Sequence, residues 1–303
     1  MGHGHDHGHG HEVPSDPDRA FRLGVLLNVG FVVVEAIYGV LADSIALLAD
    51  AAHNLSDVLG LLLAWWAARL ARRAPTPRFT YGLGKTTILA ALANAILILV
   101  AVGGVAWEAV GRLLDPPPVQ AVTVMVVAAI GVVINTAAAF LFFADRHDDV
   151  NRRAAFVHLA TDAAVSLGVV VGGAVVWWTS LNWIDPALSL VIAVVIVAGT
   201  WSVLREAFEL ATDAVPARVD PSAVERVLTA PEAVHAVHDL HVWAMSTTRV
   251  ALTAHLEMPL DAWTPALADE LVHALEDLGV HHVTLQPEPP DDRCHGCAAV
   301  PGA

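Results

Sequence analysis

The chain has 303 residues, of which 56% are hydrophobic and 16% charged, and its mean hydropathy is +0.58. This composition is too apolar for an ordinary soluble protein and excludes a disordered one, so we expect a membrane protein. The formal net charge of −15 excludes nucleic acid as a partner, because phosphate backbones bind basic surfaces.

The first 19 residues are polar and form a tail of their own, without the apolar core of a cleavable signal peptide. Histidines alternate there with Gly and Asp. A purification tag and a native metal collector both fit this composition, and the second is favoured because tags usually carry consecutive histidines. We expect a weak, cytoplasmic metal collector at His3, His5, His7, His9 and His11.

Residues 20–212 are expected to form a membrane domain of six helices. Apolar runs of about 20 residues or more, the length that spans a bilayer, lie at 20–40, 45–68, 87–110, 119–144, 154–178 and 183–209. Basic residues gather in two connections, 69–86 and 145–153, and the alternate connections carry none. The positive-inside rule then places both termini in the cytoplasm.

Residues 213–290 have a soluble composition and predict a small α+β domain. Their pattern indicates a helix at 221–230, strands at 233–245 and 249–258, a helix at 264–278 and a strand at 280–288. The second strand alternates cleanly, which indicates one face covered by a helix. The last segment, 291–303, is rich in Pro, Gly and Ala, and we expect a tail that carries the CxxC of Cys294 and Cys297.

Two apolar helices repeat one polar pattern, a histidine followed four residues later by an aspartate. His53 and Asp57 lie in the second helix, and His158 and Asp162 in the fifth. Residues four apart share a helix face, and two antiparallel helices would bring His53 level with Asp162 and Asp57 level with His158. Two imidazoles and two carboxylates suit a tetrahedral Zn²⁺ site.

A bland alternative treats each pair as a hydrogen-bonded couple that joins helices, as Asn28, Asn94 and Asn135 would. Ionisable groups are costly in hydrocarbon, and two copies of one pattern favour the metal site. Glu35 in the first helix remains open between a proton relay and a packing partner.

Several stretches together resemble the cation diffusion facilitator family: LADSIALLADAAHNLSDVLG, FTYGLGKTTILAALANA, HLATDAAVSLGVV, WIDPALSLVIA, and HDLHVW with HLEM and HHVTLQPE. The resemblance spans residues 20–288. It implies a homodimer of six-helix protomers in a bacterial cell membrane, each with a cytoplasmic, ferredoxin-like and metallochaperone-like domain. The implied activity is export of Zn²⁺, with Cd²⁺ or Co²⁺ as further substrates, in exchange for H⁺ by alternating access, and no enzymatic reaction. The family's transport site falls on His53, Asp57, His158 and Asp162.

The resemblance also implies a charge interlock at the dimer interface, formed by Lys85 and Asp213. Relatives often carry a glutamate where this chain has Thr87, so we expect a smaller charge network here. The alternative is an ordinary membrane anchor for Lys85 and a helix-end role for Asp213.

The soluble domain is expected to bind structural or regulatory Zn²⁺. By resemblance its ligands are His238, His255 and Glu288, with His281 as a further match. Two histidines of some relatives are replaced here near Pro265 and at Gln286, and Cys294 and Cys297 could complete the site. Weaker candidates, because a lone strand histidine is usually structural, are His235, His241 and His282.

The sequence also bears on two other classes of function. An intramembrane zinc protease needs an HExxH motif or an equivalent base, and the sequence at residues 53–57 is HNLSD. A membrane-embedded zinc sensor or storage protein would bind metal without moving it, and the sequence leaves that alternative open.

Overall fold

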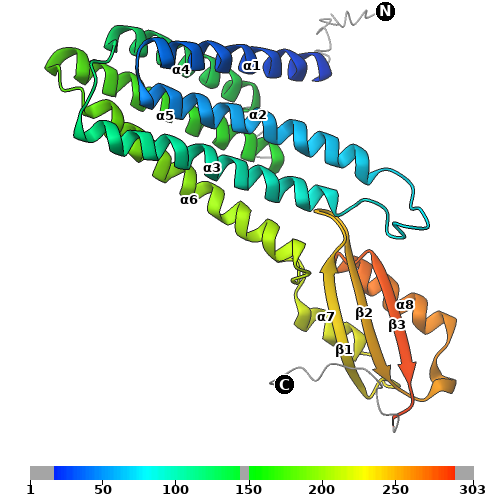
Figure 1. The fold of residues 1–303 in the computed structure, drawn as a ribbon. Coiled ribbons are helices and arrows are strands. Elements are labelled where there is room, and N and C mark those ends of the chain that lie inside the picture. Colours follow the sequence, from blue (N-terminus) through cyan, green and yellow to red (C-terminus); the bar gives the residue numbers. More distant parts are fainter. Residues whose placement is uncertain (1–16, 144–149, 291–303) are drawn as a thin grey trace, which may run out of the picture. The chain divides into compact units, whose positions relative to one another are not determined.

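The computed structural model describes the backbone of residues 17–143 and 150–290 and the side chains of residues 29–140 and 156–290. Six helices come first along the chain, and a three-stranded sheet with its helices follows (Figure 1). The chain folds as two compact units. Of the described residues, one unit holds those up to 58 together with those of 102–194, and the other holds 59–101 together with 195–290.

The six helices lie within a few residues of the apolar runs. Among the described residues, α2 to α6 are long and apolar enough to cross a membrane, and the described end of α1, Val29–Leu41, is a shorter apolar helix. The predicted α-helical membrane fold is confirmed. The bounds are α1 (Pro17–Leu41), α2 (Ile45–Ala71), α3 (Thr86–Leu114), α4 (Ala121–Phe143), α5 (Val150–Thr179) and α6 (Ile184–Ala211).

An acid from α6 holds the first turn of α2. The carboxylate of Asp185 accepts a hydrogen bond from the Ile45 backbone N–H at 2.7 Å and another from the Ser44 hydroxyl. The first N–H groups of a helix have no partner inside the helix, so a buried helix start needs such an acceptor. Asp185 and Ser44 are both buried, and they fix the beginning of α2 to the beginning of α6.

Arg112, near the end of α3, ties down the turn between α1 and α2. Its Nη1 donates to the carbonyl oxygen of Asp43 at 3.0 Å and to the Asp43 carboxylate at 2.6 Å. Asp43 has a φ of 55°, in the left-handed region that aspartate tolerates better than most residues. The hydrogen bonds from Arg112 hold this turn in place.

The α+β domain is built around the strand β2 (Val250–Glu257). It pairs antiparallel with β1 (Ala236–Ala244) and parallel with β3 (His282–Glu288). The helices α7 (Pro221–Leu228) and α8 (Pro265–Asp277) begin at the N-caps Asp220 and Thr264, each followed by a proline.

Alternation along β2 gives the domain its core. Both helices pack on one face of the sheet, as Figure 1 shows, and most buried residues of that core come from β2, its continuation at Met258, and the two helices. The others are Val242 of β1 and, from the connections, Val219, Val234 and Val280. The predicted α+β domain, with a helix-covered face, is therefore confirmed. The fully buried members from β2, α7 and α8 include Leu252, Ala254, Leu256, Val224, Leu228, Leu271 and Leu275.

We expect Asp185→Ala to lower the free energy of unfolding by about 1–3 kcal/mol, because the Ser44 hydroxyl and the Ile45 N–H lose their acceptor. Asp115→Ala is the matched control, since Asp115 is an exposed acid in the connection after α3, and we expect a change within about 0.5 kcal/mol. Thermal unfolding of the purified proteins in detergent measures both. Equal stability of the two variants would contradict the capping role.

Candidate metal sites

The two His–Asp pairs of the membrane helices meet in one cluster. His53 Nε2 lies 3.3 Å from Asp162 Oδ1, and His158 Nε2 lies 3.4 Å from Asp57 Oδ2. Within each helix the corresponding separations are 3.8 Å for His53 to Asp57 and 3.6 Å for His158 to Asp162. The cross-helix partners are those expected from two antiparallel helices with i, i+4 spacing.

This spacing suits a tetrahedral metal ion. Zn²⁺ binds imidazole nitrogen and carboxylate oxygen at about 2.0–2.2 Å, which puts neighbouring ligand atoms of a tetrahedron about 3.3–3.6 Å apart. The four N···O separations run from 3.3 to 3.8 Å. Small side-chain rotations would therefore complete such a site.

Burial differs across the cluster. The Asp162 side chain is 5% exposed and that of His53 17%, whereas that of His158 is 49% exposed. His53, Asp57 and Asp162 can offer ligand atoms that all lie within 4.8 Å of one another. His158 is within 3.6 Å of both carboxylates yet is the most accessible of the four, so it stands at the open side of the cluster.

A second cluster lies on the sheet of the α+β domain. The carboxylate of Glu288, at the end of β3, lies 3.1 Å from His238 Nε2 and 2.9 Å from His255 Nδ1. Strand pairing explains the meeting, because His238 is the partner of His255 across β1 and β2. The ligand atoms of these three residues lie within 4.8 Å of one another, so they too form a candidate metal site.

Asp239 adjoins this cluster and was missed by the sequence reasoning. It occupies the irregularity of β1 between His238 and His241, with a φ of 50°. Its carboxylate lies 3.0 Å from His241 Nε2 and 3.7 Å from His255 Nε2. The sequence does show an acid between the histidines of HDLH. In a regular strand, however, Asp239 would point to the face opposite His238, and the sequence does not reveal the bulge.

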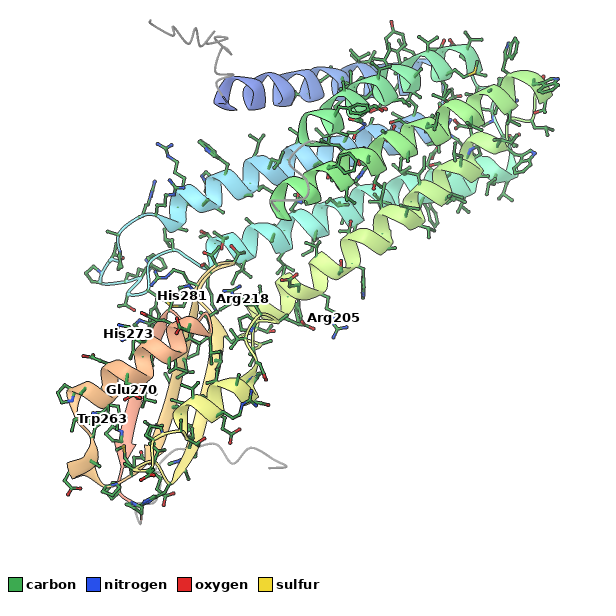
Figure 2. All side chains as sticks on the ribbon, turned by 180° about the vertical axis from the view of Figure 1, so that it is seen from behind. Arg205, Arg218, Trp263, Glu270, His273 and His281 are labelled. Atoms are coloured by element: carbon green, nitrogen blue, oxygen red, sulfur yellow. The ribbon has the colours of Figure 1, made fainter. Side chains whose placement is uncertain are left out.

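Other predicted ligands of the soluble domain lie elsewhere. His281 precedes β3, and its backbone N–H donates a hydrogen bond to the Val250 carbonyl at the start of β2. Glu288 is at the other end of β3, so the length of that strand, about 20 Å, separates the two residues. Figure 2 shows His281 at the end of the domain away from Trp263. The structure does not bring it to the cluster.

The remaining candidates are also placed apart. The His282 ring packs edge-on against the Tyr81 ring, with the ring centroids 5.4 Å apart. His235 is exposed and precedes β1. Gln286, which stands where some relatives carry a histidine, donates to Glu288 Oε1 at 2.7 Å. Pro265 begins α8. Outside the described residues lie Cys294, Cys297, His3, His5, His7, His9 and His11.

Lys85 and Asp213, the residues expected at a dimer charge interlock, form an ion pair within the chain. Lys85 Nζ lies 2.5 Å from Asp213 Oδ1, and both side chains are about half exposed, at 44% and 57%. Beside them the Thr87 hydroxyl accepts a hydrogen bond from the Thr247 backbone N–H at 3.1 Å, so this position contributes a neutral contact and no charge.

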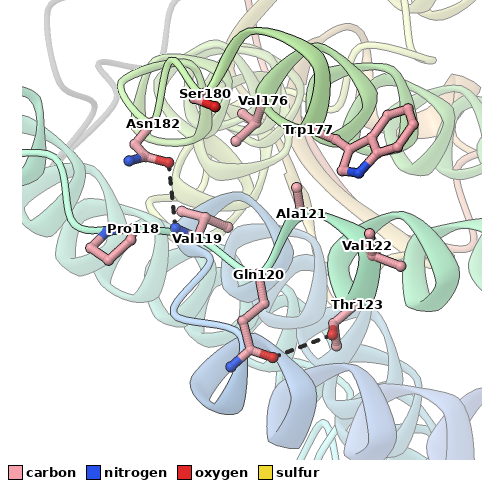
Figure 3. Close-up of a pocket in the computed structure, with 10 residues that line it drawn as sticks. All are labelled: Pro118, Val119, Gln120, Ala121, Val122, Thr123, Val176, Trp177, Ser180 and Asn182. Atoms are coloured by element: carbon pink, nitrogen blue, oxygen red, sulfur yellow. Dashed lines mark hydrogen bonds between the residues drawn. The ribbon is translucent and has the colours of Figure 1, made fainter.

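A surface hollow between the α3–α4 connection and the end of α5 has no metal-binding character. Figure 3 shows Gln120, Thr123, Ser180 and Asn182 on its wall, and none of its lining residues is His, Cys, Asp or Glu. Within the described residues, the candidate metal sites are the two clusters described above.

Comparison with known proteins matches nearly the whole chain. The family model of the cation efflux transmembrane domain matches residues 21–210, and that of the cation efflux protein cytoplasmic domain matches residues 216–290. The metal cation efflux system protein CzcD of Cupriavidus metallidurans is 31% identical over 90% of this chain and 87% of its own. The zinc transporter ZitB of Escherichia coli is 33% identical over 89% and 86%. The cadmium, cobalt and zinc/H(+)-K(+) antiporter of Bacillus subtilis is 30% identical over 89% and 88%.

We expect His255→Ala to lower the number of Zn²⁺ ions bound tightly per chain by about one, because the His238–His255–Glu288 cluster loses a ligand. His273→Ala should leave the number unchanged. His273 is exposed on α8, and its Nδ1 donates to the Asp269 carbonyl at 2.6 Å, which raises the pKa of the imidazole and so opposes metal binding. Calorimetric titration of the full-length proteins tests this, and an equal loss in both variants would refute the assignment.

Proposed function

The chain belongs to the cation diffusion facilitator family, and on this basis we propose that it exports Zn²⁺ from the bacterial cytoplasm in exchange for H⁺. It is a multi-pass membrane protein. The relatives reported above are named as efflux proteins, transporters or antiporters, which favours transport over sensing, storage or catalysis. Two of those names include zinc, and one adds cadmium and cobalt.

The observation that carries this proposal is the cluster of two imidazoles and two carboxylates inside the membrane helices. His53 and Asp57 of α2 face Asp162 and His158 of α5, at separations close to those of a tetrahedral zinc site. Charged groups in hydrocarbon cost free energy, and proteins keep them there mainly where they have a function. Passage of a cation is such a function.

The same ligands explain exchange for protons. Imidazole must be neutral to bind a metal ion, and a histidine ordinarily titrates near pH 6.5. Loading Zn²⁺ at His53 and His158 therefore expels protons, and protonation on the other side of the membrane favours release of the ion. One cluster that holds either metal or protons acts as an exchanger when it opens to one side at a time.

We assign the second cluster, at His238, His255 and Glu288, to Zn²⁺ that steadies or regulates the cytoplasmic domain. Residues 213–290 would form this domain and 20–212 the membrane domain, and the protein would work as a homodimer with Lys85 and Asp213 as its charge interlock. Support comes from the match of residues 216–290 to the family's cytoplasmic domain.

Flux into proteoliposomes tests the function. We expect Zn²⁺ uptake to follow an imposed proton gradient, and Asp57→Ala combined with Asp162→Ala to lower the rate at least about tenfold, since removal of even an outer partner of a metal ligand costs that much. Asp115→Ala should keep the native rate. Zn²⁺ binding without any flux in the native protein would make it a sensor or storage protein.

Selectivity offers a separate test. His53→Asp gives the membrane cluster a third carboxylate, and oxygen ligands that can bind through one or two atoms accommodate a larger ion such as Cd²⁺. We expect the ratio of Cd²⁺ to Zn²⁺ flux to rise by a factor on the order of 10, which corresponds to about 1.4 kcal/mol. An unchanged ratio would show that these four residues do not set selectivity.

A further inference from the structure

Four polar side chains from three helices are enclosed beside the membrane metal cluster. Glu35 belongs to α1, Asp50 and Asn54 to α2, and Ser166 to α5, and each is at most 2% exposed. Asn54 Nδ2 donates to Glu35 Oε2 at 3.1 Å, and Ser166 Oγ donates to Asp50 Oδ2 at 2.8 Å. We call these four residues the carboxyl cluster.

The two acids of this cluster face each other. Their carboxyl groups are close enough to interact with each other, yet Glu35 Oε1 and Asp50 Oδ1 are buried and receive no hydrogen bond from any described residue. Two carboxylates cannot bond each other, because neither has a donor. A proton between them would supply that donor and remove one of two like charges from a site closed to solvent.

Zn²⁺ is a poor occupant for the same space. The cluster offers oxygen atoms from Glu35, Asp50, Asn54 and Ser166 and neither imidazole nor thiolate, whereas zinc sites are built mainly from nitrogen and sulfur. Its side chains are already in mutual contact and wholly enclosed. The small occupant that fits is a proton.

The surroundings contain few other charges. His53 and Asp162 act on Asp50 through space from α2 and α5. On the described part of α1 the other titratable group is Tyr38, which is 42% exposed, and α4 contains none between Ala121 and Phe143. Among the residues that the structure describes, no hydrogen bond joins Glu35 or Asp50 to a proposed metal ligand; their partners are Asn54 and Ser166.

We propose that Glu35 and Asp50 jointly bind one proton, at a site separate from the metal ligands and connected to them through Asn54 and Ser166. Asn54 follows His53 directly, and Ser166 lies one helical turn after Asp162. Metal binding changes the charge at His53 and Asp162 and therefore the field at the proton, and by thermodynamic linkage the proton changes metal affinity by the same factor. The proposal rests on the proposed function, in which H⁺ is the exchanged ion.

Infrared spectroscopy of the full-length protein in lipid bilayers tests the proton site directly. A protonated carboxylic acid gives a C=O stretch apart from the carboxylate bands, and it shifts in D₂O. We expect this band in the native protein, altered in Glu35→Gln and in Asp50→Asn and abolished in the double variant. Glu108→Gln is the matched control, because Glu108 is half exposed and paired with Arg112, and the band should persist.

Absence of the band from the native protein, or its survival in the double variant, would overturn the proposal. Should the double variant not fold, Ser166→Ala removes only the donor to Asp50, and an unshifted band would be equally decisive against it. Calorimetry in buffers of different ionisation enthalpy adds a second readout: protons released per Zn²⁺ bound should fall by about one in Glu35→Gln/Asp50→Asn.

Flux measurements separate this proposal from the proposed function. If the native protein exchanges Zn²⁺ for H⁺ but shows no acid band, the proposed function stands and the carboxyl cluster is not a proton site. Native protein with the band but without Zn²⁺ flux keeps the proton site and loses the function.

Discussion

Charged side chains inside a bilayer must find partners, and in this protein the partners come from other helices. The His–Asp pair of α2 meets that of α5, Glu35 of α1 accepts a hydrogen bond from Asn54 of α2, and Asp185 of α6 meets the first turn of α2. Each contact offsets part of the cost of desolvating a charge. Helix α2 takes part in every one of them, so it is the element around which the polar interior of the membrane helices is arranged.

The same ligand chemistry recurs in the soluble domain on a different framework. In the membrane helices, two residues four apart on each of two helices bring imidazole and carboxylate together. On the sheet, cross-strand pairing places His238 beside His255, and the parallel neighbour β3 adds Glu288. The membrane cluster is split between two separate helices, whereas the sheet cluster is held by a continuous hydrogen-bonded ladder. Motion between helices would alter the first cluster and leave the second intact, which suits a site for cargo and a site for a resident ion.

The periodicity of the sequence predicted the helices, the strands and the pairing of His53 with Asp162, because these follow from helical and strand geometry alone. What it could not predict depends on contacts between distant segments or on local irregularity. Asp50, like Glu35, is an acid within an apolar run, which the sequence shows. That the two come together depends on how α1 packs against α2, which the sequence does not show. Asp239 needs a bulge, and the separation of His281 from Glu288 depends on the register of β3. Asp185 caps a helix 140 residues away, which no local capping signal reveals.

The anchoring of α2 by Asp185 has a mechanical consequence. Because its first turn is fixed to α6 and the preceding turn is fixed by Arg112, any tilt of α2 would have its pivot at Ser44 and Ile45. His53 is eight residues along, about 12 Å from the pivot. A tilt of about 10° would therefore carry it about 2 Å, a distance comparable with a zinc–ligand bond. A small rotation about a fixed end is thus enough to take the His53 ligand out of reach of a bound ion.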